Sequence, residues 1–185
     1  MRRCRPIVLA ALIAAVSCTA GPEGTEGGAS RRETASFSHS DSRLDGTYTL
    51  YYADGKTVSR TASYKDGMIV GEETSYYEDG KIETVMVHGD DGSLVAITAY
   101  YHSGLKSMSL RMNDENPKIG EVTFYHENGL VSEKFSLSRM SPEGPFFSYY
   151  EDGTIKKEGE YRGGRLVGVW KFYDPSGNLE RTVNY

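Results

Sequence analysis

The stretches SYYEDGK, at Ser75–Lys81, and SYYEDGT, at Ser148–Thr154, are nearly identical although more than seventy residues separate them. A duplicated catalytic loop, a tandem of ligand-binding segments or a structural repeat would each produce such a pair. The glycine of each phrase belongs to a longer series with intervals of 25, 24, 25, 24 and 24 residues: Gly55, Gly80, Gly104, Gly129, Gly153 and Gly177. The phrase is therefore one unit of a sixfold repeat that occupies residues 44–185.

The sequence pattern of each unit predicts a β-hairpin. An Asp-Gly or Asn-Gly pair such as Asp79-Gly80 supplies the positive φ angles that a tight hairpin turn needs, and a looser turn such as Lys65–Gly71 separates the units. This spacing leaves roughly six to eight residues per strand and no room for helices. The sequence therefore predicts an all-β fold, an elongated single-layer antiparallel meander of about six hairpins, or about twelve short strands.

Two positions before each turn glycine, numbered −4 and −3 from it, are mostly aromatic. Adjacent strand residues point to opposite faces of a sheet, so we expect position −4 to form a ladder that is either structural or binding, and position −3 to lie on a wetter side. Position −4 is tyrosine in every unit: Tyr51, Tyr76, Tyr100, Tyr125, Tyr149 and Tyr173. Position −3 ends with Asp174 in the last unit, and its other members together with Trp170 form the candidate exposed binding face: Tyr52, Tyr77, Tyr101, His126, Tyr150 and Trp170.

The unit resembles the variant MORN repeat over Asp45–Tyr185, with its closest matches in GPFFSYYEDGTIKKEGEYRGGRLVG and GVWKFYDPSGNLERTVNY. The third unit, VAITAYYHSGLKSMSL, is the most degraded, with Val95 in place of the first glycine. Proteins of this variant are often assigned to the YwqK-type antitoxin family, and many are lipoproteins. The resemblance implies the fold and, as an alternative function, neutralisation of a toxin by direct binding. Choline-binding repeats are a weaker comparison, because they need Trp in most units and Trp170 is the single one here.

The N-terminus predicts export. Three arginines precede the apolar run Ile7–Val16, which is too short to span a bilayer but suits the core of a signal peptide over residues 1–17. The end AAVSC resembles the lipobox of bacterial lipoproteins, with Ala15 at the usual Leu position. This resemblance implies cleavage before Cys18, lipid attachment to its thiol and a membrane anchor.

Residues 18–43 are predicted to be a lipidated N-terminus followed by a flexible linker, because they are rich in Gly, Ser, Thr and Glu and cannot bury much apolar surface. Thr19 follows the cysteine, where an Asp would suggest retention in the inner membrane. By resemblance, we expect a lipoprotein of the bacterial cell envelope, in the outer membrane.

Charge and motifs narrow the function. Without the three signal arginines, 18 Lys and Arg remain against 26 Asp and Glu, a net charge of −8, which disfavours nucleic acid as a partner. No nucleophile motif, phosphate loop or EF-hand pattern is present, so no catalysis, cofactor or metal is expected. The sequence predicts a non-catalytic scaffold that binds a protein or glycan partner. The alternative of a different class is a metal-dependent enzyme built around His88, Asp90, Asp91 and His102.

Overall fold

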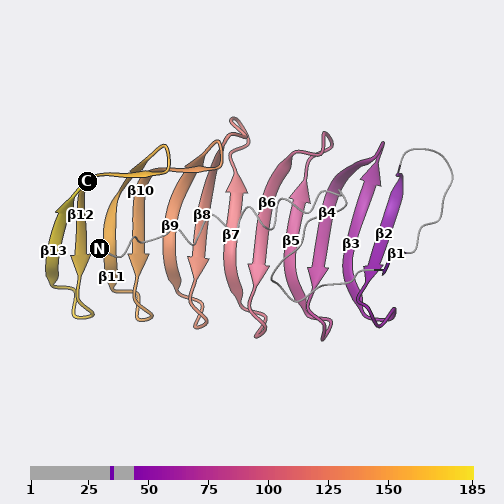
Figure 1. Cartoon of the computed structure of the whole chain (residues 1–185), viewed down its shortest axis with the longest axis horizontal. Helices are drawn as coiled ribbons and strands as arrows, with labels where there is room; N and C mark the ends of the chain where they lie inside the picture. Colours follow the sequence, from indigo (N-terminus) through magenta and orange to yellow (C-terminus); the bar gives the residue numbers. More distant parts are fainter. Residues whose placement is uncertain (1–33, 36–43) are drawn as a thin grey trace. The chain divides into compact units, whose positions relative to one another are not determined.

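A computed structural model of the chain describes residues 34–35 and 44–185, which form one antiparallel sheet (Figure 1). Among these residues, thirteen strands follow one another in chain order and each is hydrogen-bonded to the next. The strands are β1 (Thr34–Ala35), β2 (Gly46–Tyr51), β3 (Val58–Lys65), β4 (Met68–Tyr76), β5 (Ile82–His88), β6 (Leu94–Tyr100), β7 (Lys106–Met112), β8 (Ile119–Tyr125), β9 (Val131–Ser138), β10 (Ser141–Tyr149), β11 (Ile155–Arg162), β12 (Arg165–Tyr173) and β13 (Leu179–Asn184).

The predicted all-β meander is confirmed, with strands β2–β13 forming six hairpins. The added strand β1 falls within the segment predicted to be a flexible linker and pairs with β2. The signal peptide, the rest of that linker and Cys18 lie outside the described residues. No helix within the described ranges is long and apolar enough to cross a membrane.

The turns at the two ends of the strands differ. At three of the five junctions between units the turn is tighter than the turn inside a hairpin, which is the reverse of the prediction. In the second hairpin, the Gly80 N–H donates to the Tyr77 carbonyl at 2.9 Å, and Gly80 has φ 82° while Asp79 is not in the left-handed region. This is a type I turn closed by a glycine bulge, not the two-residue turn expected for Asp-Gly. Two-residue turns instead join successive units at three of the five junctions, as at Asp66-Gly67, where both φ angles are positive. The β5–β6 and β7–β8 junctions have longer loops.

One of these unit-joining turns carries no glycine. Arg139 and Met140 connect β9 to β10 with φ angles of 51° and 63°, a conformation that side chains with a Cβ adopt at a cost in free energy. The corresponding turn between β11 and β12 has Gly163 and Gly164 at the same places. The geometry of these two-residue turns is therefore imposed by strand pairing and not by the turn residues alone.

One face of the sheet, which we call the spine face, carries a row of cross-strand neighbours that are largely buried. Ile97 is 1% exposed and Val122 is 0% exposed at its centre. The register joins the following residues into one row across β2–β11: Tyr48, Ala62, Glu73, Met86, Ile97, Leu110, Val122, Phe135, Phe146 and Gly159. This row crosses ten strands with nearest-neighbour contacts, which is how a repeat protein builds a continuous core.

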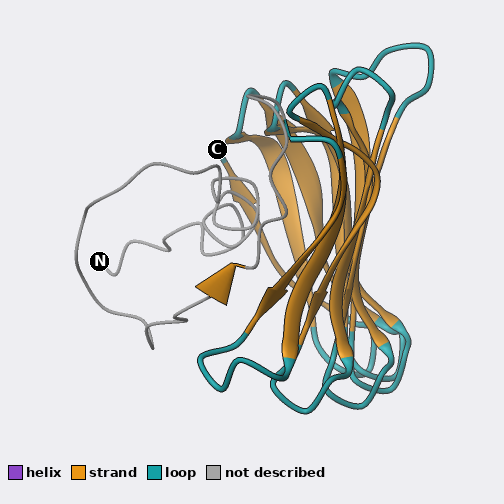
Figure 2. Cartoon of the chain, turned by 90° about the vertical axis from the view of Figure 1, so that its right-hand side faces the viewer, coloured by secondary structure: helices purple, strands orange, loops and turns teal. Residues whose placement is uncertain are grey.

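Trp170 extends this row into β12, and a glycine makes room for it. A Cβ on Gly159 would lie 2.2 Å and 2.3 Å from two atoms of the Trp170 ring, so the indole lies directly on the β11 backbone. Trp170 also packs 5.5 Å from the Phe146 ring and 5.2 Å from the Tyr161 ring, measured between centroids. Figure 2 shows the strands twisting and bending together, so the faces of this sheet are curved.

We expect Gly159→Ala to lower the free energy of unfolding by about 1–3 kcal/mol, because the new methyl group would overlap the Trp170 ring. Denaturant unfolding followed by circular dichroism measures the loss. The same substitution made in a Trp170→Leu background should cost less, because the smaller side chain can move aside. An equal cost in both backgrounds would show that the indole is not the obstacle.

Candidate binding surface

Position −3 links each repeat to the next. The Tyr101 hydroxyl donates to the carbonyl of Tyr125, at 2.6 Å, although the two residues are 24 positions apart. The same bond recurs along the sheet, with the −3 side chain donating to the −4 carbonyl of the following unit: Tyr52 to Tyr76, Tyr77 to Tyr100 at 2.7 Å, His126 Nε2 to Tyr149 at 3.0 Å, and Tyr150 to Tyr173 at 2.8 Å. Tyrosine and histidine share this role because both are ring donors.

The prediction that position −3 and Trp170 form an exposed face is therefore wrong for two members. Tyr52 is 7% exposed and Trp170 is 2% exposed. The other members, Tyr77, Tyr101, His126 and Tyr150, are half-buried. Strand alternation places position −3 on the spine face, where its ring atoms lie over the ends of the strands and its donor reaches the neighbouring unit. These side chains stabilise the stacking of repeats.

The −4 tyrosines lie on the opposite face, which we call the tyrosine face. Each one is the last residue of an even-numbered strand, β2 to β12, and all six are half-buried. Since they occur on every second strand, neighbouring tyrosines are about 9–10 Å apart, or two strand spacings. Five of the six pair across their hairpin with an aliphatic residue, the exception being Tyr100 with Lys106: Tyr51–Val58, Tyr76–Ile82, Tyr125–Val131, Tyr149–Ile155 and Tyr173–Leu179.

The rest of the tyrosine face is polar over its N-terminal two-thirds. Two residues inward from the tyrosines, hydroxyl side chains pair across successive strands, with one valine among them: Thr49, Thr61, Thr74, Val85, Thr98, Ser109 and Thr123. The Tyr125 hydroxyl lies 3.3 Å from Ser109 Oγ in this row. No described residue forms a second layer over this face, because every described strand belongs to the one sheet.

The turns beside the tyrosines are acidic. Asp79 accepts a hydrogen bond from the Lys81 N–H at 3.2 Å, and this bond is the main cause that lowers its pKa below the ordinary value. Asp152 is held in the same way by the Thr154 N–H, at 2.8 Å, which lowers its pKa. The glutamates one residue earlier in three of these turns are exposed: Glu78, Glu127 and Glu151.

The residues of the enzyme alternative do not come together. His88 lies at the end of β5 on the spine face, where its Nε2 is 3.1 Å from a carboxylate oxygen of the buried Glu73. His102 lies in the turn after β6, at the opposite edge of the sheet, where its Nε2 is 3.2 Å from Asp79. The length of β6, about 20 Å, separates these two ends of the strands. Among the described residues, no group of three or more His, Cys, Asp or Glu could hold a metal ion.

Glu73 is the centre of a polar cluster that the sequence did not suggest. The Arg60 guanidinium lies 3.3 Å from one carboxylate oxygen of Glu73, and His88 lies against the other. Burial, followed by the nearby charge of Glu73, raises the pKa of Tyr64 above its ordinary value. An unpaired buried carboxylate is costly, and both carboxylate oxygens of Glu73 have a nitrogen partner here, so this cluster has a structural role on the spine face.

A second carboxylate on the spine face lies towards the C-terminal end. Glu133 pairs across the sheet with Phe124 and Ser148. Burial raises the pKa of Glu133, and the charges of Lys157 and Lys156 oppose this only in part. Lys157 is turned towards aromatic rings, with its Nζ 4.7 Å from the Phe146 centroid, a cation–π contact.

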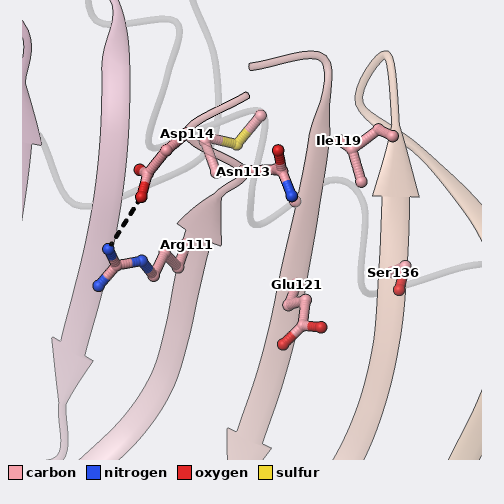
Figure 3. Close-up of a pocket in the computed structure, with 8 residues that line it drawn as sticks. Arg111, Asn113, Asp114, Ile119, Glu121 and Ser136 are labelled. Atoms are coloured by element: carbon pink, nitrogen blue, oxygen red, sulfur yellow. Dashed lines mark hydrogen bonds and ion pairs between the residues drawn. The ribbon is translucent and has the colours of Figure 1, made fainter. Parts of the chain in front are cut away.

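A shallow hollow of about 280 Å³ lies beside the loop between β7 and β8, at the end of the strands opposite the tyrosines (Figure 3). Figure 3 shows Arg111 reaching Asp114, whose carboxylate is 3.5 Å away, with both side chains 75% exposed. An ion pair this exposed is weak. The hollow is lined by Arg111, Met112, Asn113, Asp114, Ile119, Gly120, Glu121 and Ser136, and neither its depth nor its charges define a ligand.

Comparison with protein families assigns the repeat. Residues 44–66, 69–86, 142–162 and 166–185 match the MORN repeat variant. Residues 87–141, which include the degraded third unit, lie between the matched segments but have the same hairpins and the same −3 hydrogen bonds. The chain is therefore a MORN-repeat protein. MORN repeats generally serve as scaffolds that bind proteins or membranes, and they are generally not catalytic. Comparison with curated proteins gives no significant match.

We expect Tyr101→Phe to lower the free energy of unfolding by about 1 kcal/mol, because the Tyr125 carbonyl loses its donor while the ring is kept. The neighbouring substitution Tyr100→Phe is the matched control, since that hydroxyl belongs to the tyrosine face, and its cost should be near zero. Urea denaturation of both variants makes the comparison. Equal losses would mean that the −3 bond does not stabilise the stack.

The raised pKa of Glu133 predicts a pH-dependent effect of Glu133→Gln. A carboxyl group whose pKa is raised by folding stabilises the protein below its unfolded pKa, and this contribution is lost as pH rises through the folded pKa. The neutral glutamine should therefore raise the thermal midpoint at pH 7 and leave it nearly unchanged at pH 4. Asp152→Asn should act in the opposite direction at pH 7, because the pKa of Asp152 is lowered. A lower midpoint for Glu133→Gln at pH 7 would show that its lysine neighbours outweigh burial.

Proposed function

We propose that this protein is an exported, lipid-anchored scaffold that binds a protein or glycan partner at the bacterial cell envelope through its tyrosine face. The observation that carries the proposal is the row of six half-exposed tyrosines on a sheet face that no described residue covers. Aromatic rings with hydroxyl groups are well suited to binding, because they offer large apolar area and a hydrogen bond at low entropic cost. The spine face is less available, since its rings pack on one another.

The anchor is supported by the N-terminal sequence, in which a basic start, an apolar run and AAVSC precede Cys18. Acyl chains on this cysteine would hold the protein at a membrane, and the composition of residues 18–43 would let the sheet stand away from the surface. The outer membrane is the proposed address. A toxin as the partner would give the antitoxin role that the resemblance implies.

The anchor is tested by labelling cells with an alkyne-tagged fatty acid. The wild-type protein should carry the label and sediment with membranes, and Cys18→Ala should do neither. A Cys18→Ala variant that stays membrane-bound would overturn the lipid anchor while leaving the binding proposal open to its own test.

The binding surface is tested by photo-crosslinking in cells. A photoreactive amino acid at Glu127, in an exposed turn beside the tyrosines, should give an adduct with a protein or glycan. The same amino acid at Asp90, in an exposed turn at the opposite edge, is the matched control and should give none. Equal adducts from both positions, or none from either, would overturn binding at the tyrosine face.

A further inference from the structure

One position of the repeat changes along the tyrosine face. Position −6 lies six residues before each turn glycine and two residues before the −4 tyrosine. It is threonine in the first four units and then phenylalanine and lysine: Thr49, Thr74, Thr98, Thr123, Phe147 and Lys171. The other phenylalanines of the described strands pair within the spine face: Phe124, Phe135, Phe146 and Phe172. Phe147 therefore offers a half-buried apolar ring where four other units offer a hydroxyl group.

Opposite charges flank Phe147 on the two neighbouring strands. The register pairs Phe147 with Lys134 on β9 and with Glu158 on β11. The pairing is regular at these residues and the residues next to them belong to the spine row, so alternation places all three on the tyrosine face. Lys171 Nζ lies 2.9 Å from the Glu158 carboxylate, and hydrogen bonds from Lys171 and Tyr173 lower the pKa of Glu158. Lys134 is exposed, and no ion pair holds it to another described residue.

This row of cation, ring and anion is complementary to itself. Two copies can place their tyrosine faces together when a two-fold axis lies between the sheets, which pack about 10 Å apart. An axis parallel to β10 and above Phe147 exchanges the two sides of that strand, so each Lys134 faces Glu158 of the other copy. An axis across the strands would place Lys134 on Lys134 and Glu158 on Glu158, and like charges repel. The charge pattern therefore selects the axis parallel to the strands, which gives the aligned packing of two sheets.

We infer that this protein forms a two-fold dimer in which the tyrosine faces of two copies pack on each other around Phe147. Because β13 is the third strand beyond β10, the described sheets would overlap from β7 to β13. Strands β2 to β6 stay uncovered, and they carry Tyr51, Tyr76 and Tyr100. The inference goes beyond the proposed function, since the dimer leaves half of the tyrosine row for a different partner and presents it twice, which favours bivalent binding.

The test measures energy transfer between full-length chains that carry a donor or an acceptor dye on a C-terminal tag. The chains are purified in detergent and diluted with micelles, so that two chains rarely share a micelle by chance. We expect half of the chains to pair at roughly 10–100 µM, because a contact over a few strands is small for a specific interface. A wild-type chain that stays monomeric throughout this range would overturn the inference.

The substitution Phe147→Thr removes the ring and introduces the residue that four other units carry. It should weaken pairing about tenfold, and circular dichroism checks that the variant is folded. The matched control is Thr98→Ala, at position −6 of the third unit and outside the overlap, which should leave pairing unchanged. Equal pairing of the folded Phe147→Thr variant and the wild-type chain would overturn the inference.

A mixture of two charge variants tests the direction of the axis. The variants Lys134→Glu and Glu158→Lys should each pair more weakly with themselves than the wild-type chain does, because like charges then face each other in both contacts. Mixed together, they should pair about tenfold more tightly than either variant alone, because each contact again joins opposite charges. A mixture that pairs no better than the separate variants would overturn the inference.

The dimer and the proposed function fail separately. An adduct at Glu127 with a different protein or a glycan, on a chain that stays monomeric, would overturn the dimer and leave the proposed function intact. A dimer that responds to these variants, without such an adduct, would support the inference and count against the proposed function.

Discussion

The hydrogen bond from position −3 to the next −4 carbonyl is the constraint on which the stack of repeats depends. At Tyr77 the backbone N–H and carbonyl are both used within the turn, by Lys81 and Gly80, so the ring leaves the turn in a fixed direction. Its hydroxyl then donates a hydrogen bond to the carbonyl of Tyr100 in the following unit. A repeat period of 24 or 25 residues places the next −4 carbonyl within hydrogen-bonding distance of the −3 side chain at each junction. In a sheet whose described part has no second layer, this bond adds to strand pairing what a covering layer would otherwise supply.

The sixth unit does not make this −3 hydrogen bond. Asp174 occupies position −3 of the sixth unit, and its carboxylate accepts from the Ser176 and Asn178 N–H groups, both at 2.9 Å. These backbone hydrogen bonds, with that of Asn178 first, lower its pKa. A carboxylate cannot donate to a carbonyl, so this side chain accepts hydrogen bonds within its own turn instead of making the −3 bond.

The sequence predicted the strands and hairpins because their signals are local: a glycine period and runs of alternating residues. It did not predict which face is buried. Alternation separates Tyr100 from Tyr101 but says nothing about which side is inside, and both are tyrosines. The available signal was that position −3 holds ring donors until Asp174. Trp170 was misplaced because its partner is Gly159, a strand glycine eleven residues earlier, which marks a close approach. The Asp-Gly turns inside the hairpins were misassigned because Asp-Gly occurs both in two-residue turns and in glycine-bulge turns.

The two faces divide the aromatic residues between folding and binding. Rings on the spine face stabilise the fold, since Phe135 packs on Phe146 and Phe146 packs on Trp170 along the sheet. Tyrosines on the other face are half-buried and pair across their hairpins, and some make further contacts, as the Tyr173 hydroxyl does by donating to Glu158 at 2.8 Å. Their separation is set by backbone hydrogen bonds between strands, which hold neighbouring strands about 4.7–4.9 Å apart. Side-chain substitution elsewhere cannot change this distance, so the spacing that a ligand would read follows directly from the interaction that forms the sheet.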